Sequence, residues 1–244
     1  MAGTIDLGNR CALITGAARG IGRAIALSLA EAGANIAVNY RQRDQEANEV
    51  VEAIRKLGAR AIAVQADVSD ATTVKAMGAK VEREIGSIDI LVNNAGVALH
   101  RSLDDLTEAD FDHTIAVNLK SAFLCTQLVL PHMRAQQWGR IVNISSGAAR
   151  GAGVVGAHYN ASKAGMEGLT RGYAARLVKE GITVNAVAPS LIQTDMIPAR
   201  SAAGKVPLGR LGLPEEVAQV VLMVIGNAYM TGQTVQVNGG MHFN

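Results

Sequence analysis

The stretch CALITGAARGIG (11–22) decides the fold of this 244-residue chain. Its first five residues are typical of a buried β-strand, and three glycines then mark a tight turn: Gly16, Gly20 and Gly22. Apolar residues at helical spacing follow: Ile21, Ile25 and Leu29. In such a unit a phosphate meets free N–H groups at the positive end of the helix, and glycines leave room for it. Because the spacing is GxxxGxG rather than GxGxxG, the stretch predicts either a nucleotide-binding turn or an ordinary glycine-rich turn.

The same alternation of strand and helix continues to the end of the chain. We expect seven strands, at 11–15, 35–40, 61–66, 88–93, 140–145, 182–188 and 233–237. Glycines end several of the intervening helices, and a proline begins the last one: Gly33, Gly58, Gly86, Gly181 and Pro214. Strands separated by helices pair in parallel through right-handed crossovers. The sequence therefore predicts an α/β fold, a Rossmann-type doubly wound sheet of seven parallel strands with helices on both faces, in a single domain over residues 1–244.

The composition agrees with a parallel sheet that is buried on both faces. Hydrophobic residues make up 49% of the chain and aromatic residues only 3%, so the core is built from Ala, Val, Ile and Leu. The formal net charge is +2 and the basic residues are dispersed, which gives no footprint for a nucleic acid or an anionic membrane. We see no membrane-spanning run and no signal region, and we expect a soluble cytoplasmic protein. Cys11, Cys125, His100 and His113 show no metal-ligand spacing, so no metal site is expected.

The end of the second strand favours one nicotinamide cofactor over the other. NAD-binding folds usually place an acidic residue there for the ribose hydroxyls, whereas the 2′-phosphate of NADP requires cations. Here the strand ends in Asn39-Tyr40-Arg41, without an acid. Arg19 and Arg41 could both reach a 2′-phosphate, and guanidinium suits its geometry. The sequence therefore predicts NADP(H), the alternative being that both arginines are solvated surface residues.

Two further strand ends carry polar groups that fit a nucleotide. Asp67, before Val68, could accept a hydrogen bond from the adenine amino group, or it could be the N-cap of the next helix. The amides of NNAG (93–96) could stabilise the sheet or line the cofactor, and we expect both.

Tyr159 and Lys163 are the candidates for proton transfer. They stand four residues apart in a helical segment, so their Cβ atoms lie about 5–6 Å apart on one face. A free tyrosine has a pKa near ~10, and a neighbouring ammonium favours the phenolate. Such a tyrosine can protonate a carbonyl oxygen as hydride arrives, or deprotonate an alcohol in the reverse direction. Ser146 ends the fifth strand, and its hydroxyl could hold the substrate oxygen.

Together these motifs resemble the classical short-chain dehydrogenase/reductase family over essentially the full length. The matching segments are TGAARGIG at 15–22, Asp67-Val68, NNAG at 93–96, Asn118, Ser146, YNASK at 159–163, 185–194 and the terminal TGQTVQVNGG. The resemblance implies that Tyr159 is the acid/base, that Ser146 orients the carbonyl, that Lys163 lowers the tyrosine pKa and binds the ribose, and that Asn118 holds a water in a proton relay. It also implies a homotetramer in which the helices at 112–134 and 159–179 pack across an interface.

The cofactor and substrate residues follow from the same comparison of motifs. We expect the cofactor to contact Thr15, Gly16, Arg19, Gly20, Ile21, Gly22, Tyr40, Arg41, Asp67, Val68, Asn94, Ala95, Gly96, Tyr159, Lys163, Pro189, Ile192 and Thr194. We expect the substrate pocket to be lined by Val154, Val155, His158, Leu191 and Met196, under a short lid at about 195–206. Where the family commonly has Pro-Gly, this chain has Pro189-Ser190, which weakens claims about local geometry but not about the class.

The subgroup that the chain most resembles is the 3-oxoacyl-[acyl-carrier-protein] reductases, through RIVNISS (140–146), PLGR (207–210) and the ending VNGG. Members that serve the carrier protein often have basic residues where this chain has Gln137 and Glu180, although Arg134, Arg171 and Lys179 could compensate. We therefore expect an NADPH-dependent carbonyl reductase that resembles the 3-oxoacyl thioester reductases. The alternatives are a broad-specificity ketone reductase, a non-catalytic NADP-binding regulatory protein and, disfavoured by Arg41, an NAD-dependent sugar or steroid dehydrogenase.

Overall fold

Seven parallel strands form one sheet in the computed structural model, which describes residues 5–8, 10–194 and 203–243. The strands are β1 (Cys11–Ile14), β2 (Asn35–Tyr40), β3 (Ala61–Gln65), β4 (Ile88–Asn93), β5 (Gly139–Ile144), β6 (Ile182–Pro189) and β7 (Thr234–Val237). Their order across the sheet is β3-β2-β1-β4-β5-β6-β7, and every neighbouring pair is parallel. The predicted fold class is confirmed, and all seven predicted strands lie within one residue of the observed bounds.

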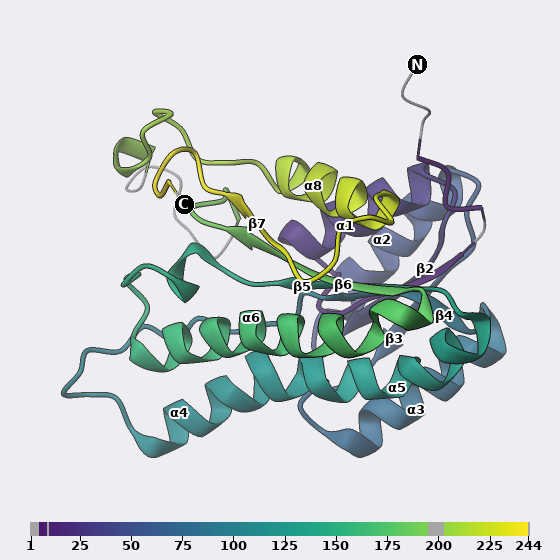
Figure 1. The fold of residues 1–244 in the computed structure, drawn as a ribbon, viewed down its shortest axis with the longest axis horizontal. Coiled ribbons are helices and arrows are strands. Elements are labelled where there is room, and N and C mark those ends of the chain that lie inside the picture. The colour runs from purple at the N-terminus through teal and green to yellow at the C-terminus, as the bar shows by residue number, and fades with distance from the viewer. Residues whose placement is uncertain (1–4, 9, 195–202, 244) are drawn as a thin grey trace.

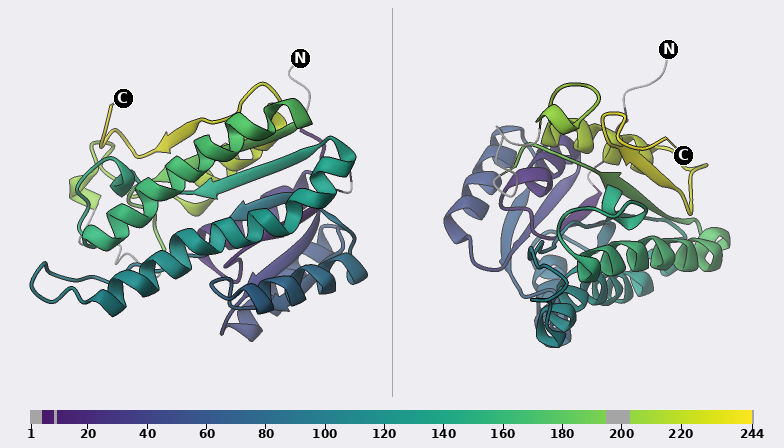
Figure 2. Two further views of the ribbon diagram at one scale, coloured as in Figure 1. Left: turned by 60° about the horizontal axis from the view of Figure 1, so that its bottom comes forward. Right: turned by 90° about the vertical axis from the view of Figure 1, so that its left-hand side faces the viewer.

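Helices cover both faces of this sheet. They are α1 (Gly20–Glu31), α2 (Asp44–Lys56), α3 (Ala71–Glu84), α4 (Glu108–Ile115), α5 (Ser121–Gln136), α6 (Ala157–Leu177) and α8 (Pro214–Gly226). Figure 1 shows α1, α2 and α8 on one face and α3, α5 and α6 on the other, and Figure 2 shows the same layers from two further sides. The buried side chains form two main clusters, one under each helix layer. The strands are therefore apolar on both faces, as the low aromatic and high aliphatic content predicts.

The sheet order decides where a ligand can lie. The chain winds outward from β1 to β3 and then returns to pair β4 with the other edge of β1. The loops after β1 and β4 consequently diverge at the carboxyl edge of the sheet, and such a switch point is where open parallel sheets bind their ligands. The loops after β1, β2, β4, β5 and β6 all open at this edge.

The helical run Glu108–Gln136 has an irregularity that the sequence does not predict. Between α4 and α5, the residues Ala116–Lys120 form a π-helical segment, which widens one turn and carries Asn118. The run as a whole has the length and mean hydropathy (1.2) of a membrane span, but half of that window is buried inside the protein. Core helices of water-soluble proteins satisfy the same criteria, so this is weak support for a membrane location.

Candidate active site

The glycine-rich turn after β1 is locked to the loop after β4. The hydroxyl of Thr15 accepts hydrogen bonds from the backbone N–H groups of Asn94 and Ala95, both at 2.9 Å. The side chain of Asn94 donates in return to the carbonyls of Thr15 (2.8 Å) and Gly16 (3.1 Å). A Cβ at Gly22 would lie 2.5 Å from the Asn94 Nδ2 atom, so only glycine fits there. The cofactor residues predicted on these two loops are therefore brought together.

The N-terminus of α1, which has no side-chain cap, lies at this turn. Its N-cap, Arg19, has an extended backbone and makes no side-chain cap, and the first turn contains no acidic residue. Gly16 and Gly20 have φ values of +63° and +53°, which bend the chain into the turn. Unpaired N–H groups at the positive end of a helix favour an anion such as a phosphate.

The ends of β2 and β3 meet through an ion pair. The guanidinium of Arg41 lies 3.6 Å from the carboxylate of Asp67, and both side chains are partly exposed. Asp67 also accepts from the backbone N–H (2.9 Å) and hydroxyl (2.6 Å) of Ser69, and the Ser69 hydroxyl does most to hold the Asp67 pKa below its usual range. The N-cap of α3 is Asp70, which accepts from the N–H of Thr73 at 2.8 Å. The alternative interpretation of Asp67 as that N-cap is therefore wrong.

The side chain of Tyr40 is buried and forms a hydrogen bond with a residue of the next helix. It is almost fully buried and its hydroxyl donates to the carboxylate of Asp44, at the start of α2. This hydrogen bond, with burial, raises the pKa of Tyr40 to about 12. Val68, predicted beside the cofactor, is also buried, at the start of the loop that leads to α3.

The predicted chemical residues converge at the carboxyl end of β5. Ser146 follows β5 and caps a short 3-10 turn, Gly147–Ala149, whose Ala148 N–H donates to its hydroxyl at 3.2 Å. Tyr159 lies in the first turn of α6, near enough to Ser146 for that side chain to lower the Tyr159 pKa. Lys163 is 4% exposed, its Nζ atom lies 5.8 Å from the centroid of the Tyr159 ring, and the same atom donates to the Ile144 carbonyl at 2.8 Å.

Burial dominates the ionisation of this pair. It raises the pKa of Tyr159, against the lowering effect of the Ser146 side chain. It also lowers the pKa of Lys163 from 10.5 to about 8. In the protein alone Tyr159 is therefore a neutral phenol at physiological pH. The lowering of its pKa by Lys163, which the resemblance implies, stays a prediction.

Asn118 anchors the loop after β4 to α6. Its side-chain oxygen accepts from the N–H of Val97 at 2.8 Å. Its side-chain nitrogen donates to the carbonyl of Val97 at 3.0 Å and to the hydroxyl of Ser162 at 3.1 Å. A Cβ at Gly96 would lie 3.3 Å from the Asn118 oxygen and 3.6 Å from the Lys163 Nζ. The π-helical segment thus carries Asn118 into contact with the residues around Lys163.

The side chain of Ser190 fills the space beside Gly147, the residue after Ser146. A Cβ at Gly147 would lie 2.3 Å from the Ser190 hydroxyl, so the serine is accommodated by a glycine across from it. Pro189 ends β6, and Ile192 is buried and pairs with Gly212 in an isolated parallel bridge. On the nucleotide side, a Cβ at Gly20 would contact the Thr194 methyl group at 3.4 Å, so the loop after β6 reaches the turn after β1.

The predicted substrate pocket is only partly as expected. Val154 is 75% exposed, and Val155 and Leu191 are partly buried. His158 is 0% exposed and therefore does not line a pocket, which corrects its assignment. The ring points into the protein, where its Nε2 atom donates to the carbonyl of Leu99 at 3.0 Å. Met196 and residues 195–202 of the predicted lid lie outside the described residues.

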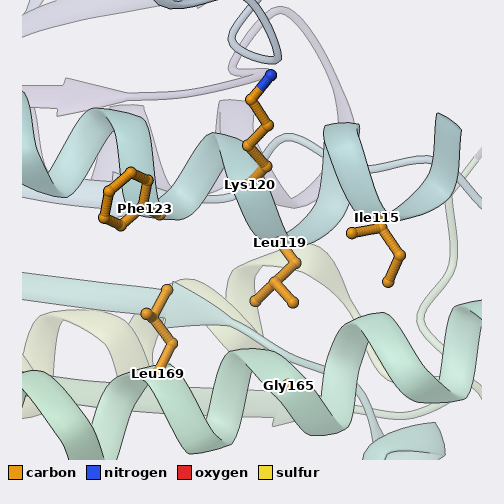
Figure 3. A pocket seen from close by; sticks show the side chains of 6 residues that line it. All are labelled: Ile115, Leu119, Lys120, Phe123, Gly165 and Leu169. Atoms are coloured by element: carbon orange, nitrogen blue, oxygen red, sulfur yellow. The ribbon is translucent and has the colours of Figure 1, made fainter. Parts of the chain in front are cut away.

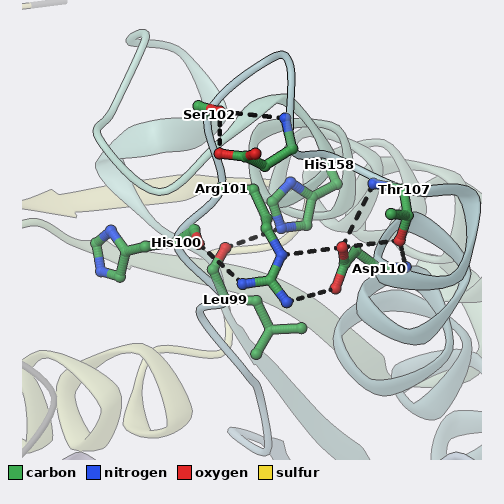
Figure 4. Close-up of polar contacts among 8 residues, drawn as sticks. Leu99, His100, Arg101, Ser102, Thr107, Asp110 and His158 are labelled. Atoms are coloured by element: carbon green, nitrogen blue, oxygen red, sulfur yellow. Dashed lines mark hydrogen bonds and ion pairs between the residues drawn. The ribbon is translucent and has the colours of Figure 1, made fainter.

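A network beside this pocket has a sequence signal that was not used. In Figure 4, Arg101 reaches both carboxylate oxygens of Asp110, at 2.9 Å each, and Asp110 forms a capping box with Thr107 at the start of α4. The pattern Thr-x-x-Asp before a helix is the signature of such a box. It could have located the start of α4, but nothing in the sequence indicates the partnership with Arg101.

The outer face of α4, α5 and α6 holds a shallow apolar pocket. Its lining residues are Ile115, Leu119, Lys120, Phe123, Gly165 and Leu169. Figure 3 shows the side chains of Ile115, Leu119 and Leu169 between the two helical runs, with the Phe123 ring at one end. This pocket lies away from Tyr159 and Lys163 and is not part of the candidate active site.

The comparisons with known proteins show the family of this chain. A family model described as short chain dehydrogenase matches residues 10–204. The chain is 46% identical over 243 residues to the 3-oxoacyl-[acyl-carrier-protein] reductase FabG of Staphylococcus aureus strain Mu50, a match that covers 96% of this chain and 98% of that protein. It is 39% identical over 247 residues to nodulation protein G of Azospirillum brasilense, with 97% and 100% covered. A solved structure of a candidate gluconate dehydrogenase from Agrobacterium tumefaciens superimposes with a TM-score of 0.92 at 34% identity, covering 98% of each chain.

Proposed function

This chain belongs to the short-chain dehydrogenase family of oxidoreductases, and on that premise we propose that it is an NADPH-dependent reductase of ketones, with 3-oxoacyl thioesters as the first substrate class. The observation that carries the proposal is the buried Lys163, whose Nζ atom lies 5.8 Å from the centroid of the Tyr159 ring at the end of β5, where Ser146 follows the strand. This group lies at the same edge of the sheet as the glycine-rich turn. Neither the Tyr159 group nor the glycine-rich turn alone would support a redox reaction, but together they support the proposal of a proton donor next to a nucleotide site.

Each of the central side chains has a proposed task. The substrate carbonyl oxygen accepts hydrogen bonds from Tyr159 and Ser146, and Tyr159 gives up its proton to that oxygen as the alcohol forms. A bound reduced nicotinamide would supply the hydride to the carbonyl carbon. Lys163 supplies a cation that stabilises the phenolate left behind and holds the nicotinamide ribose. Asn118 keeps the loop after β4 against α6 and, as the resemblance implies, holds a water in the proton relay.

The residues at the turn after β1 fit a dinucleotide. Thr15, Gly16 and Gly22 are packed against the loop after β4, which leaves the first turn of α1 facing outward with its N–H groups unpaired by any side-chain cap. These groups would hold the pyrophosphate. We propose that Arg41, with Arg19, favours NADP(H), because β2 ends without an acid and the nearby carboxylate of Asp67 is already paired.

The substrate class rests on a balance of two observations. The relative from Staphylococcus aureus, at 46% identity, is named a 3-oxoacyl-[acyl-carrier-protein] reductase, which supports a 3-oxoacyl thioester. Against a carrier protein as partner, Arg134 is held by Glu180 in a two-bond ion pair at 2.7 and 3.3 Å. A cation held by two such bonds, closer than the 3.6 Å between Arg41 and Asp67, adds less attraction for an acidic partner. Broad-specificity reduction of ketones without a carrier is therefore the second candidate function.

Assembly and location complete the proposal. We propose a cytoplasmic homotetramer in which the face of α4, α5 and α6 packs against a second copy. Phe123 and Phe111 are 44% and 43% exposed on this helical run, beside the apolar pocket. Exposed aromatic side chains next to an apolar pocket are typical of a surface that another chain covers.

The test is NADPH oxidation by the purified protein with two kinds of substrate. An acetoacetyl thioester and an aryl ketone are each supplied with NADPH and, separately, with NADH. We expect turnover with NADPH, and the relative kcat/KM of the two substrates decides between the two candidate functions. Tyr159→Phe should lose turnover by at least about 100-fold while it still binds NADPH. Tight NADPH binding without turnover of any ketone would instead support a non-catalytic, regulatory protein.

A further inference from the structure

Two loops beside the candidate active site are joined by three hydrogen bonds. We name them the β4 loop (94–107) and the α6 loop (150–156). The backbone N–H of Arg101 donates to the carbonyl of Val155 at 3.0 Å, and the ring of His100 contacts the carbonyl of Val154 at 3.3 Å. Just beyond the α6 loop, His158 donates to the carbonyl of Leu99 at 3.0 Å. These contacts tie the position of one loop to that of the other.

His158 is built into this junction. Its ring is fully buried, and because a carbonyl can only accept, the Nε2 atom must carry the proton. Its other ring nitrogen is buried and has no partner among the described residues. A Cβ at Gly156 would lie 2.6 Å from the His158 Cε1 atom, and Gly156 has a φ of +146°. Only glycine leaves room for the ring, and the next residue after His158 is Tyr159.

Arg101 extends the junction to a helix. Its guanidinium donates two parallel hydrogen bonds to Asp110, whose carboxylate also accepts from the Thr107 hydroxyl at 2.8 Å. Such two-bond pairs fix orientation as well as distance. The Arg101 side chain donates back to the His100 carbonyl at 3.2 Å as well. Figure 4 shows the arginine between the loop and the start of α4.

We infer that His158 and the Arg101–Asp110 pair form a latch that sets the substrate selectivity of this site. The latch fixes the segment 99–101, from which a backbone N–H and a histidine ring reach the carbonyls of Val155 and Val154, and so it sets where these two valines stand. His158 is a positioning residue, since its buried ring cannot touch a substrate. A loosened latch lets the α6 loop move outward, which admits a bulkier ketone and holds a small one less well. This inference rests on the proposed ketone reductase activity.

The test compares two β-keto esters with a small and a bulky group on the ketone carbon, ethyl acetoacetate (methyl) and ethyl benzoylacetate (phenyl). The measured quantity is the ratio of their kcat/KM values with NADPH. A lower fraction of folded enzyme scales both values equally, so a purely structural loss leaves the ratio unchanged. In His158→Leu, which keeps an apolar side chain but loses the donor, we expect the ratio to shift toward the bulky ester by on the order of tenfold. His158→Gln should restore the wild-type ratio, because its amide nitrogen can replace Nε2.

Arg101→Gln should shift the ratio in the same direction by a smaller factor. The matched control is Arg55→Gln, which removes a comparable pair of contacts, to Glu52 at 2.8 Å and to the Ala61 carbonyl at 3.0 Å, between α2 and β3. Its ratio should equal that of the wild type. Unchanged ratios in His158→Leu and Arg101→Gln would overturn the latch. Should His158→Leu fail to fold, Arg101→Gln decides alone, because that side chain is 38% exposed. A wild-type protein that reduces neither ester would refute the proposed function instead.

Discussion

Arg41 is the side chain on which the proposed preference for NADPH depends. It stands after β2 and pairs with Asp67 at 3.6 Å, so its charge is directed toward the end of β3. In Arg41→Asp, two carboxylates would face the 2′-phosphate where one ion pair stood. Repulsion should raise the KM for NADPH by at least about tenfold, since each ~1.4 kcal/mol of lost binding is a factor of ten. The KM for NADH, which lacks that phosphate, should change little.

Steady-state kinetics with each cofactor at saturating ketone would measure this difference. Arg55→Asp places the same charge change at the far end of α2 and serves as the control. If Arg41→Asp raises both KM values by the same factor, Arg41 supports the fold of the site and does not select the cofactor.

Lys163 should make the stability of the protein depend on pH in a defined window. Burial lowers its pKa from 10.5 to about 8. Between these values the unfolded chain binds the proton that the folded protein has lost, so stability rises with pH through this window. Below pH 8 the cost of the buried charge is present in full. In Lys163→Met this cost is absent at every pH.

The quantity to measure is the difference in unfolding free energy between wild type and Lys163→Met, in urea, at pH 7.5 and 9.5. The wild type should gain about 2 kcal/mol relative to the variant across that interval, at roughly 1.4 kcal/mol per pH unit above pH 8. The difference is used because burial also raises the pKa of the Cys11 and Cys125 thiols to about 12, which lowers stability in the same range. A difference that does not change with pH would show that Lys163 titrates normally.

At the scale of elements, the turns that end helices differ in how much they depend on glycine. Gly58, after α2, has a φ of +89° and open space where a Cβ would be. Gly181, before β6, has a φ of +70°, but a Cβ there would lie 2.0 Å from the carbonyl oxygen of Gln137. Gly58→Ala should cost about 1–2 kcal/mol for the left-handed backbone alone. Gly181→Ala should cost the same amount plus about 1–3 kcal/mol for overpacking.

Thermal and urea unfolding of the two variants would measure both costs. Equal losses would contradict the close approach of the β5 and β6 entry turns. Gln137 in this contact has a φ of +51° and is the only non-glycine residue with a positive φ in the described part of the chain.

Helices and strands that are marked by neighbouring residues in the sequence could be predicted. Aliphatic runs between glycines located every strand within one residue, and Pro214 located the start of α8. The π-helical segment Ala116–Lys120 was not predicted, since its residues also suit an α-helix. The pairing of Arg41 with Asp67 was missed for a related reason. Each residue was interpreted at its own strand end, and only the sheet register sets the distance between those ends.

His158 shows the same limit inside the candidate site. The sequence predicts that His158 lines the substrate pocket. The first turn of α6 instead directs His158 inward to Leu99. The residues Tyr159, Ser146 and Lys163 could be found from motifs, whereas burial and loop partners required the folded chain.

At the scale of the whole molecule, the candidate active site lies at one edge of the sheet, and the proposed assembly surface is one helical face. The face formed by α4, α5 and α6 carries the apolar pocket lined by Leu119 and Leu169, with the Phe123 ring beside it (Figure 3). An isologous contact would cover this face in both copies at once. In Phe123→Asp, a carboxylate would be buried at the contact without a partner, at a cost of several kcal/mol per interface.

Light scattering coupled to size-exclusion chromatography would measure the molar mass of the assembly. We expect four chains for the wild type and at most two for Phe123→Asp, with an unchanged circular dichroism spectrum because Phe123 is 44% exposed in the single chain. Leu57→Asp is the matched control, since Leu57 is 47% exposed but lies after α2 on the opposite helix layer. It should keep the wild-type mass. A Phe123→Asp protein that also keeps that mass would place the interface on another face, because no assembly through α4, α5 and α6 could bury this charge twice and survive.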